Sequence, residues 1–217
     1  MSRPVIHYVE QGSDEWFELR RGIPTASVFK QIMTPAKWKL SASRRPLMQH
    51  LLSERCVDDA STFSGTRWTE IGNEREPDAR QQYMDETGLE VQEVGFVLRL
   101  DPKCGASPDA VVMQDEQIIR GLEIKCPAIA THIKWLDEGK LPNEYALQVQ
   151  GSMYVTGAAQ WDFYSYFPGV KPFRLEVKRD DDCIDAFEEC LKQFWVEYNK
   201  LTQRLSPGLL VEQEVAS

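Results

Sequence analysis

The segment GASPDAVVMQDEQIIRGLEIKCPA, residues 105–128, decides the fold. Two apolar stretches flank the polar residues Gln114–Gln117, a pattern typical of two antiparallel strands joined by a tight turn. A turn centred near residue 116 places Asp109 opposite Glu123. The segment therefore predicts a hairpin that brings two carboxylates side by side.

A lysine joins these carboxylates, because side chains alternate between the two faces of a strand. Lys125 shares the face of Glu123, and the residues expected on the opposite, core-facing side are Leu122, Ile124 and Cys126. Two carboxylates are hard oxygen ligands for Mg²⁺, and an ammonium group beside them can orient or deprotonate a water. This combination of residues indicates metal-assisted hydrolysis of a phosphodiester.

A simpler interpretation is an edge strand with charged residues facing solvent, since an acid followed by Glu-x-Lys often arises by chance. The placement of Asp109 favours catalysis. Ser107-Pro108-Asp109 ends a loop where the apolar run Ala110–Met113 begins, so Asp109 lies at the start of a strand.

The composition predicts one α/β domain over residues 1–205 and a tail over residues 206–217. With 217 residues, 42% of them hydrophobic, the chain is long enough for one well-packed core. The five cysteines are scattered and there are only three histidines, which disfavours a zinc site. No signal-peptide pattern or long apolar run occurs, so we expect a soluble cytoplasmic protein.

The net charge of −9 argues against a protein that coats nucleic acid non-specifically. A nuclease with this balance must concentrate its positive charge locally. The segment PAKWKLSASRRP surrounds Trp38 with basic residues, namely Lys37, Lys39, Arg44 and Arg45. This segment can contact phosphates and stack on a base, and a solvated basic loop explains it equally well.

Thr25-Ala26-Ser27 predicts the start of a helix with good capping residues, and Arg20 and Arg21 precede it. A helix N-terminus with nearby arginines can bind an anion such as a terminal phosphate. An ordinary N-cap with surface arginines is the alternative, and it is the more frequent case.

Hydrophobic periodicity predicts an α-β-β-β-α-β order with a further strand and helix at the end. Helices are expected over residues 67–86, over Asn143–Val155 with an end at Gly157, and over a final amphipathic segment. The apolar face of that last segment comprises Ile184, Phe187, Leu191, Phe194, Tyr198 and Leu201. The strands are expected at residues 91–98, 105–113, 118–126, 161–167 and 173–178.

With the acids at these positions, the chain resembles the PD-(D/E)xK nuclease superfamily and, within it, the phage lambda exonuclease family of viral alkaline exonucleases. The likeness covers roughly residues 9–200. It is carried by QGSDEWFELRRGIPTAS, GNEREPDAR, GASPDA, GLEIKCP and YALQVQGSMYVTG. The resemblance implies an α/β core with a mixed central sheet flanked by helices.

Position by position, the resemblance implies that Asp109, Glu123 and the Ile124 carbonyl bind Mg²⁺, which Mn²⁺ can replace. Lys125 would orient or activate the attacking water, and Gln148 would line the site. Glu76 would hold a second metal or its waters. The residues implied to contact DNA are Arg20, Ser27 and Ser107, which would grip the 5′-phosphate, and Arg67, near the scissile region.

Pro77 departs from what a helix interior favours, because proline removes a hydrogen bond and favours a helix start or a kink. We therefore expect the orientation of the Glu76 side chain to be less well defined than that of Asp109 and Glu123. A plain capping or solvated acid is the alternative for Glu76.

Family members are Mg²⁺-dependent exonucleases that degrade one strand of duplex DNA from its 5′ end and leave a 3′ single-stranded tail. The resemblance further implies a homotrimeric ring around DNA, a single-strand annealing partner and a phage or prophage origin. Two alternatives remain: a structure-specific or restriction-like endonuclease, and a non-catalytic DNA-binding protein on the same fold. Arg20, Ser27 and Ser107 disfavour the first, and intact catalytic residues disfavour the second.

Overall fold

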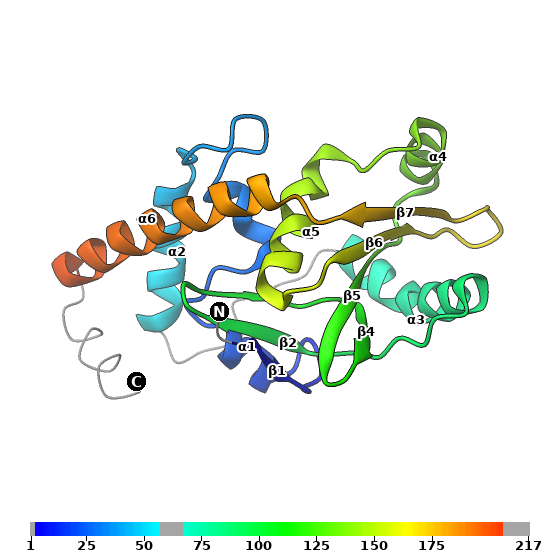
Figure 1. The fold of residues 1–217 in the computed structure, drawn as a ribbon, viewed down its shortest axis with the longest axis horizontal. Coiled ribbons are helices and arrows are strands. Elements are labelled where there is room, and N and C mark those ends of the chain that lie inside the picture. Colours follow the sequence, from blue (N-terminus) through cyan, green and yellow to red (C-terminus); the bar gives the residue numbers. More distant parts are fainter. Residues whose placement is uncertain (1–2, 57–66, 206–217) are drawn as a thin grey trace.

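Two β-sheets form the centre of the molecule (Figure 1). The computed structural model describes residues 3–56 and 67–205, with residues 67–73 described by their backbone alone. The three-stranded sheet has the order β1-β2-β3, and the four-stranded sheet has the order β4-β5-β6-β7. The strands are β1 (Val5–His7), β2 (Phe96–Leu100), β3 (Lys103–Ala106), β4 (Ala110–Gln114), β5 (Gln117–Lys125), β6 (Gln160–Ser165) and β7 (Phe173–Lys178).

Helices cover both faces of the four-stranded sheet, with α3 on one face and α4 and α5 on the other (Figure 1). This sheet is mixed, because β5 and β6 are parallel whereas β4 and β7 are antiparallel to their neighbours. The helices are α1 (Asp14–Arg20), the 3-10 helix η1 (Ala26–Gln31), α2 (Arg44–Cys56), α3 (Arg67–Thr87), α4 (Ile129–Glu138), α5 (Asn143–Thr156) and α6 (Asp181–Leu205). The predicted α/β class and the mixed sheet between helices are confirmed.

The hairpin that the sequence predicts is present, but its geometry differs in one respect. β4 and β5 are joined by the two residues Asp115 and Glu116, both with positive φ, so the turn centre lies half a residue earlier than expected. A β-bulge at Ile119 corrects the offset, because Val112 pairs with Arg120 and Met113 with Ile118. The extra residue returns the register to the one that brings Asp109 to Glu123.

Two predicted strands differ from those observed. The strand expected over residues 105–113 is divided between β3 and β4, which belong to different sheets. Pro108 lies in the break and has no N–H to donate to a ladder. The strand expected over residues 91–98 begins only at Phe96, because upstream of it Gln92 pairs with Val111 of β4, in the other sheet, through two hydrogen bonds of 2.9 Å.

Four elements differ from the expected order. The sequence interpretation missed β1, α2 and α4, and it expected an ordinary helix where the six-residue 3-10 helix η1 forms. α2 begins inside the basic segment at Arg44, whose guanidinium pairs with Glu197 of α6 at 3.1 Å. That contact joins positions far apart in the chain, so local periodicity carries no signal for it.

The three helices predicted from periodicity are confirmed, and α3 (Arg67–Thr87) matches the range expected over residues 67–86. α5 ends at Gly157, which adopts a left-handed conformation with φ of 78°. All six residues of the predicted apolar face of α6 are buried. The tail expected over residues 206–217 and the side chains of Trp68 and Ile71 lie outside the described residues. None of the described helices combines the length and the apolar character needed to cross a membrane.

Candidate active site

The hairpin positions three charged groups that we call the carboxylate centre: Asp109, Glu123 and Lys125. Backbone bonds between the two strands fix Asp109 beside Glu123. The Asp109 N–H donates to the Leu122 carbonyl at 3.2 Å, and the Asp109 carboxylate accepts from the Ile124 N–H at 2.6 Å. These two bonds bracket Glu123, so the predicted pairing of the acids is present.

Lys125 lies among the oxygen atoms of this centre. Its Nζ is 2.5 Å from Glu123 Oε1, 2.9 Å from the Ile124 carbonyl and 4.0 Å from Asp109 Oδ2. The Glu123 side chain is only 3% exposed, which leaves water little access to it. The three oxygens that the sequence analysis associates with Mg²⁺ therefore already face one cation, the ammonium group.

The electrostatics of the centre favour a bound cation. Burial raises the pKa of Glu123 to about 7; Lys125 opposes this shift and Asp109 adds to it. Burial likewise raises the pKa of Asp109 despite the opposing charge of Lys125. Burial acts to lower the pKa of Lys125, but Glu123 and Asp109 outweigh it and hold that pKa above its ordinary value. Two buried acids with a single lysine leave an excess of negative charge.

α5 lies on the face of the sheet opposite α3 and places two polar side chains against the carboxylate centre. Gln148 donates from Nε2 to Glu123 Oε1 at 2.5 Å. The ring centroid of Tyr145 lies 5.5 Å from the Lys125 ammonium. Gln148 thus lies beside the acids, where the sequence analysis expected it, and Tyr145 is a neighbour that the sequence analysis did not identify.

Glu76 reaches the same region from α3, and Pro77 does not interrupt the helix. α3 runs from Arg67 to Thr87, close to the range of 67–86 that periodicity predicts, despite the hydrogen bond lost at residue 77. Burial and then the charge of Asp109 raise the pKa of Glu76 to about 7, while Arg80 and Lys125 oppose the shift. Arg80 also pairs with Glu76 at 2.9 Å.

A pocket of about 180 Å³, which we call the Arg20 pocket, adjoins the centre. It contains the three residues expected to hold a 5′-phosphate, although they come from α1, η1 and the β3–β4 loop. Gln148 lines this pocket as well as contacting Glu123. The full lining is Gln11, Trp16, Arg20, Thr25, Ala26, Ser27, Ser107, Gln148 and Ser152.

Arg20 is held in place by two neighbours in this pocket. Its guanidinium lies 3.9 Å from the centroid of the Trp16 ring and donates to the Ser107 hydroxyl at 2.8 Å. The Trp16 indole N–H donates to the same hydroxyl at 3.0 Å. Both lone pairs of Ser107 are engaged, so its O–H hydrogen is left to bind a ligand. Burial lowers the pKa of Arg20 to about 10, which leaves it charged at neutral pH.

The helix expected to begin at Thr25-Ala26-Ser27 takes a different form. η1 is a short 3-10 helix and its N-cap residue Thr25 makes no capping bond. The Thr25 hydroxyl lies 3.3 Å from that of Ser27 instead. The pocket thus depends on Arg20 and hydroxyl groups converging from separate segments. Trp16 and Ser152 were not singled out from the sequence as pocket residues, since only the tertiary fold brings them to Arg20.

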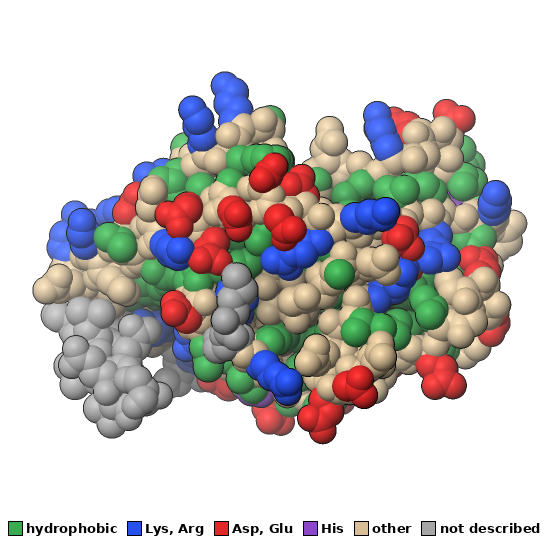
Figure 2. Space-filling view, viewed as in Figure 1, with side chains coloured by type: hydrophobic (Ala, Val, Ile, Leu, Met, Phe, Trp, Pro, Cys, Tyr) green, Lys and Arg blue, Asp and Glu red, His purple; other side chains and the backbone are tan. Residues whose placement is uncertain are grey.

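The basic residues of the segment PAKWKLSASRRP differ in their contacts. Arg44 pairs with Glu197, whereas no ion pair among the described residues involves Lys37 or Lys39. Trp38 lies between them with φ of 49° and is 39% exposed. Figure 2 shows basic side chains projecting at the edge where the loop before α2 lies in Figure 1. The side chain of Arg67 lies outside the described residues.

The oxygen atoms of the centre fit a hard divalent cation. No group of three or more His, Cys, Asp or Glu side chains with metal-binding geometry occurs in the described residues. Mg²⁺ does not require such a group, because one or two carboxylates with waters and substrate oxygens suffice. Asp109, Glu123 and the Ile124 carbonyl form such a set, and the ammonium group among them already occupies the place of a cation.

Comparison with known families identifies the class of protein. The profile of the YqaJ-like viral recombinase domain matches residues 15–159, which include the carboxylate centre and all lining residues of the Arg20 pocket except Gln11. The chain belongs to this family. YqaJ-like proteins of the lambda exonuclease type are PD-(D/E)xK nucleases, as the sequence motifs predict, so the chain is a viral-recombinase-type nuclease. Among curated proteins, no sequence matches the chain.

Solved structures resemble this YqaJ-like domain over most of its length. LHK-Exo, an alkaline exonuclease from Laribacter hongkongensis, is 33% identical with a TM-score of 0.77, and the match covers 91% of this chain and 98% of LHK-Exo. A structure of LHK-Exo in complex with dAMP matches equally well and is covered completely. A phage-related exonuclease from Haemophilus somnus 129PT shares the fold, with 18% identity, a TM-score of 0.66 and coverage of 88% and 99%.

Proposed function

We propose that the protein is a Mg²⁺-dependent exonuclease that degrades the 5′-phosphorylated strand of duplex DNA in the 5′-to-3′ direction. The observation that carries this proposal is the place of Gln148, which borders both the carboxylate centre and the Arg20 pocket. An anion-binding pocket next to a cation-binding centre suits a strand whose terminal phosphate is held while a neighbouring phosphodiester is cut.

The Arg20 pocket explains why digestion would proceed in the 5′-to-3′ direction. A guanidinium and hydroxyl groups form charge-assisted hydrogen bonds with a phosphate, and these bonds are stronger than neutral ones. Each cut creates a new 5′-phosphate, which can enter the pocket and place the next phosphodiester at the carboxylate centre. The complex of LHK-Exo with dAMP supports this assignment, because dAMP is a deoxynucleoside monophosphate of the kind that an exodeoxyribonuclease releases.

The carboxylate centre supplies the chemistry. Asp109, Glu123 and the Ile124 carbonyl would hold Mg²⁺, which would supply a bound water of lowered pKa and offset charge on the phosphoryl oxygens. The raised pKa of Lys125 keeps its ammonium protonated in the metal-free protein, which supports an orienting role more than a base role. Gln148 holds Glu123 in place. Glu76, aimed toward Asp109, is our candidate to hold a second metal or its waters.

The biological setting that we propose is phage-type recombination in the cytoplasm of a bacterial host. The 3′ single-stranded tail left by the enzyme would be the substrate of a single-strand annealing recombinase. A homotrimeric ring around the duplex would let basic groups face the DNA while the acids of a chain with net charge −9 face outward.

Digestion of a linear duplex tests the proposal. The duplex carries a label at either end and a 5′-phosphate or 5′-hydroxyl, with a closed circular duplex as the control. We expect Mg²⁺-dependent loss of the 5′-phosphorylated strand and intact circles. Nicked or linearised circles would support an endonuclease instead, and the absence of cleavage with Mg²⁺ or Mn²⁺ would leave a DNA-binding protein.

A further inference from the structure

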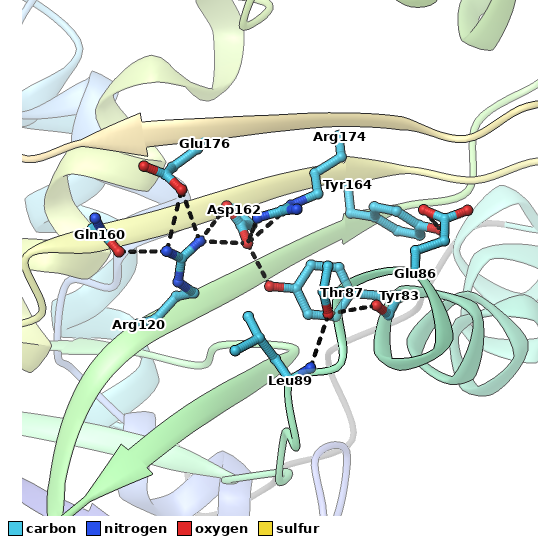
Figure 3. Close-up of polar contacts among 10 residues, drawn as sticks. All are labelled: Tyr83, Glu86, Thr87, Leu89, Arg120, Gln160, Asp162, Tyr164, Arg174 and Glu176. Atoms are coloured by element: carbon cyan, nitrogen blue, oxygen red, sulfur yellow. Dashed lines mark hydrogen bonds and ion pairs between the residues drawn. The ribbon is translucent and has the colours of Figure 1, made fainter.

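A buried carboxylate lies at the centre of a charged network on the α3 side of the sheet (Figure 3). Asp162 of β6 has no exposed surface. It accepts from Arg120 Nη1 of β5 at 2.9 and 3.0 Å and from Arg174 Nε of β7 at 3.3 Å. The phenol of Tyr83 donates to it from α3. One carboxylate thus joins three adjacent strands to a helix.

The phenol contact is not needed to balance the charge of Asp162. Two guanidinium groups already face this carboxylate, and Arg120 also bonds Glu176 at 3.2 Å. Tyr83 differs from the other partners of Asp162 because it comes from outside the sheet. A buried ionic group is weak evidence for stability, and its best-supported use is to fix one arrangement among several.

The arrangement that this contact fixes includes an acid of the proposed site. Tyr83 follows Glu76 by two helical turns, so the two side chains lie on one face of α3. Between them on that face, Ala79 is completely buried against the sheet. Pro77 has no N–H, so the turn that carries Glu76 lacks one backbone hydrogen bond.

The same carboxylate also restrains the strand of the carboxylate centre. Arg120 lies on β5 next to the bulge and three residues before Glu123. Asp162 therefore contacts two of the elements that bring acids to the site, α3 through Tyr83 and β5 through Arg120. A rotation or shift of α3 would break the phenol contact and change the position of Glu76 relative to Asp109.

We propose that the Tyr83–Asp162 contact is a positioning device that sets the rotation and axial position of α3 and so aims Glu76 at the carboxylate centre. This inference rests on the proposed function, because it assigns a task to Glu76. Tyr83 and Asp162 act through Glu76, so they are positioning residues and do not touch the substrate.

A double-mutant cycle on the full-length protein tests the coupling. Tyr83→Phe removes the hydroxyl and keeps the buried ring. We expect the rate of nucleotide release at saturating 5′-phosphorylated duplex to fall about tenfold, since small misplacements of catalytic groups are costly, with little change in KM. In a Glu76→Gln background, Tyr83→Phe should cause no further fall.

Tyr154→Phe is the matched control. Tyr154 also donates from a buried ring to a carboxylate, Glu188 at 3.1 Å, and an arginine lies beside it, but its partner is on α6. We expect it to lower the melting temperature without changing the rate. Any variant unstable at the assay temperature is measured at a lower temperature, where its circular dichroism matches that of the wild type.

The outcomes separate this inference from the proposed function. A fall caused by Tyr83→Phe that is equal in both backgrounds, or no fall at all, would overturn the positioning role while leaving the nuclease intact. A wild-type protein that releases no nucleotides would instead reject the proposed function. If Glu76→Gln alone retains the wild-type rate, Glu76 has no catalytic role that the position of α3 could affect, and the inference is rejected.

Discussion

The carboxylate centre and the Arg20 pocket lie on either side of Gln148 and carry opposite charge. In the centre, two buried acids share one lysine, and burial raises the pKa of both acids. In the pocket, a half-buried arginine rests on Trp16 and contacts a neutral hydroxyl, and its partial burial lowers its pKa. One region is prepared for a cation and the other for an anion. In the proposed function, their adjacency holds a terminal phosphate and a metal at fixed positions along one DNA strand.

Removing a ligand from the centre should have the largest effect. Asp109→Asn retains an acceptor for the Ile124 N–H but loses the charge, so we expect cleavage to fall by about a thousandfold or more, since metal catalysis supplies several kcal/mol. The 5′ end should still bind. Nucleotide release and DNA affinity measured on the same preparation check both statements, and near wild-type cleavage would remove Asp109 from the site.

Removing the charge from the pocket should affect one kind of end only. We expect Arg20→Ala to slow digestion of 5′-phosphorylated duplex about 30-fold, because a hydrogen bond to a charged group contributes about 1.5–3 kcal/mol. Duplex with a 5′-hydroxyl should be nearly unaffected at initiation. Arg20→Lys, which keeps the charge and loses the planar fork, should lie in between. An equal loss on both kinds of end would contradict the phosphate pocket.

The raised pKa values in the centre predict a pH dependence that the pocket lacks. With the pKa of Glu123 about 7, protons compete with Mg²⁺ below that pH, and the apparent Mg²⁺ affinity should fall about tenfold per unit. In the metal-free protein, stability contributed by this group is present below its ordinary pKa of 4.5 and is lost as pH rises through about 7.

Two titrations check this pH dependence. Mg²⁺ titrations of cleavage across pH 6–9 follow the affinity, and chemical unfolding with a chelator present follows the stability. Glu123→Gln should flatten the stability profile in this range. A metal affinity that does not change between pH 6 and 7 would exclude Glu123 as a titrating ligand.

The smallest effect should come from the basic turn around Trp38, outside both regions. If Lys37 and Lys39 contact phosphates, changing both to glutamine should weaken DNA binding by a few fold at moderate salt. The slope of log affinity against log salt should decrease by about two. Lys200→Gln on α6 serves as a control. An unchanged slope would support the solvated-loop interpretation of this segment.

The carboxylate centre could be predicted from the sequence because Asp109, Glu123 and Lys125 lie within one hairpin, where strand alternation decides which side chains meet. The Arg20 pocket was a different case. Arg20 precedes the helix start at Thr25-Ala26-Ser27, so the local sequence associated Arg20 with Ser27. Ser107 comes from a distant segment, so only the family resemblance associated it with them. The neighbours Trp16 and Ser152 had no local signal. Pro77 did not prevent the helix from being predicted over residues 67–86, and in the structure Ala79 and Tyr83 pack α3 against the sheet beyond it.

With the bulge at Ile119 in place, the number of residues between Asp109 and Glu123 decides whether both acids lie on the same face of the sheet. An insertion or deletion of one residue between Asp109 and Glu123 would turn one acid toward α3 unless a second bulge formed, whereas a change of two residues would preserve the face. We therefore expect related sequences and engineered variants to accept changes in this loop in steps of two. The length of the hairpin could therefore vary widely by even numbers of residues. An odd insertion or deletion would leave a folded protein in which Asp109 and Glu123 lie on opposite faces of the sheet.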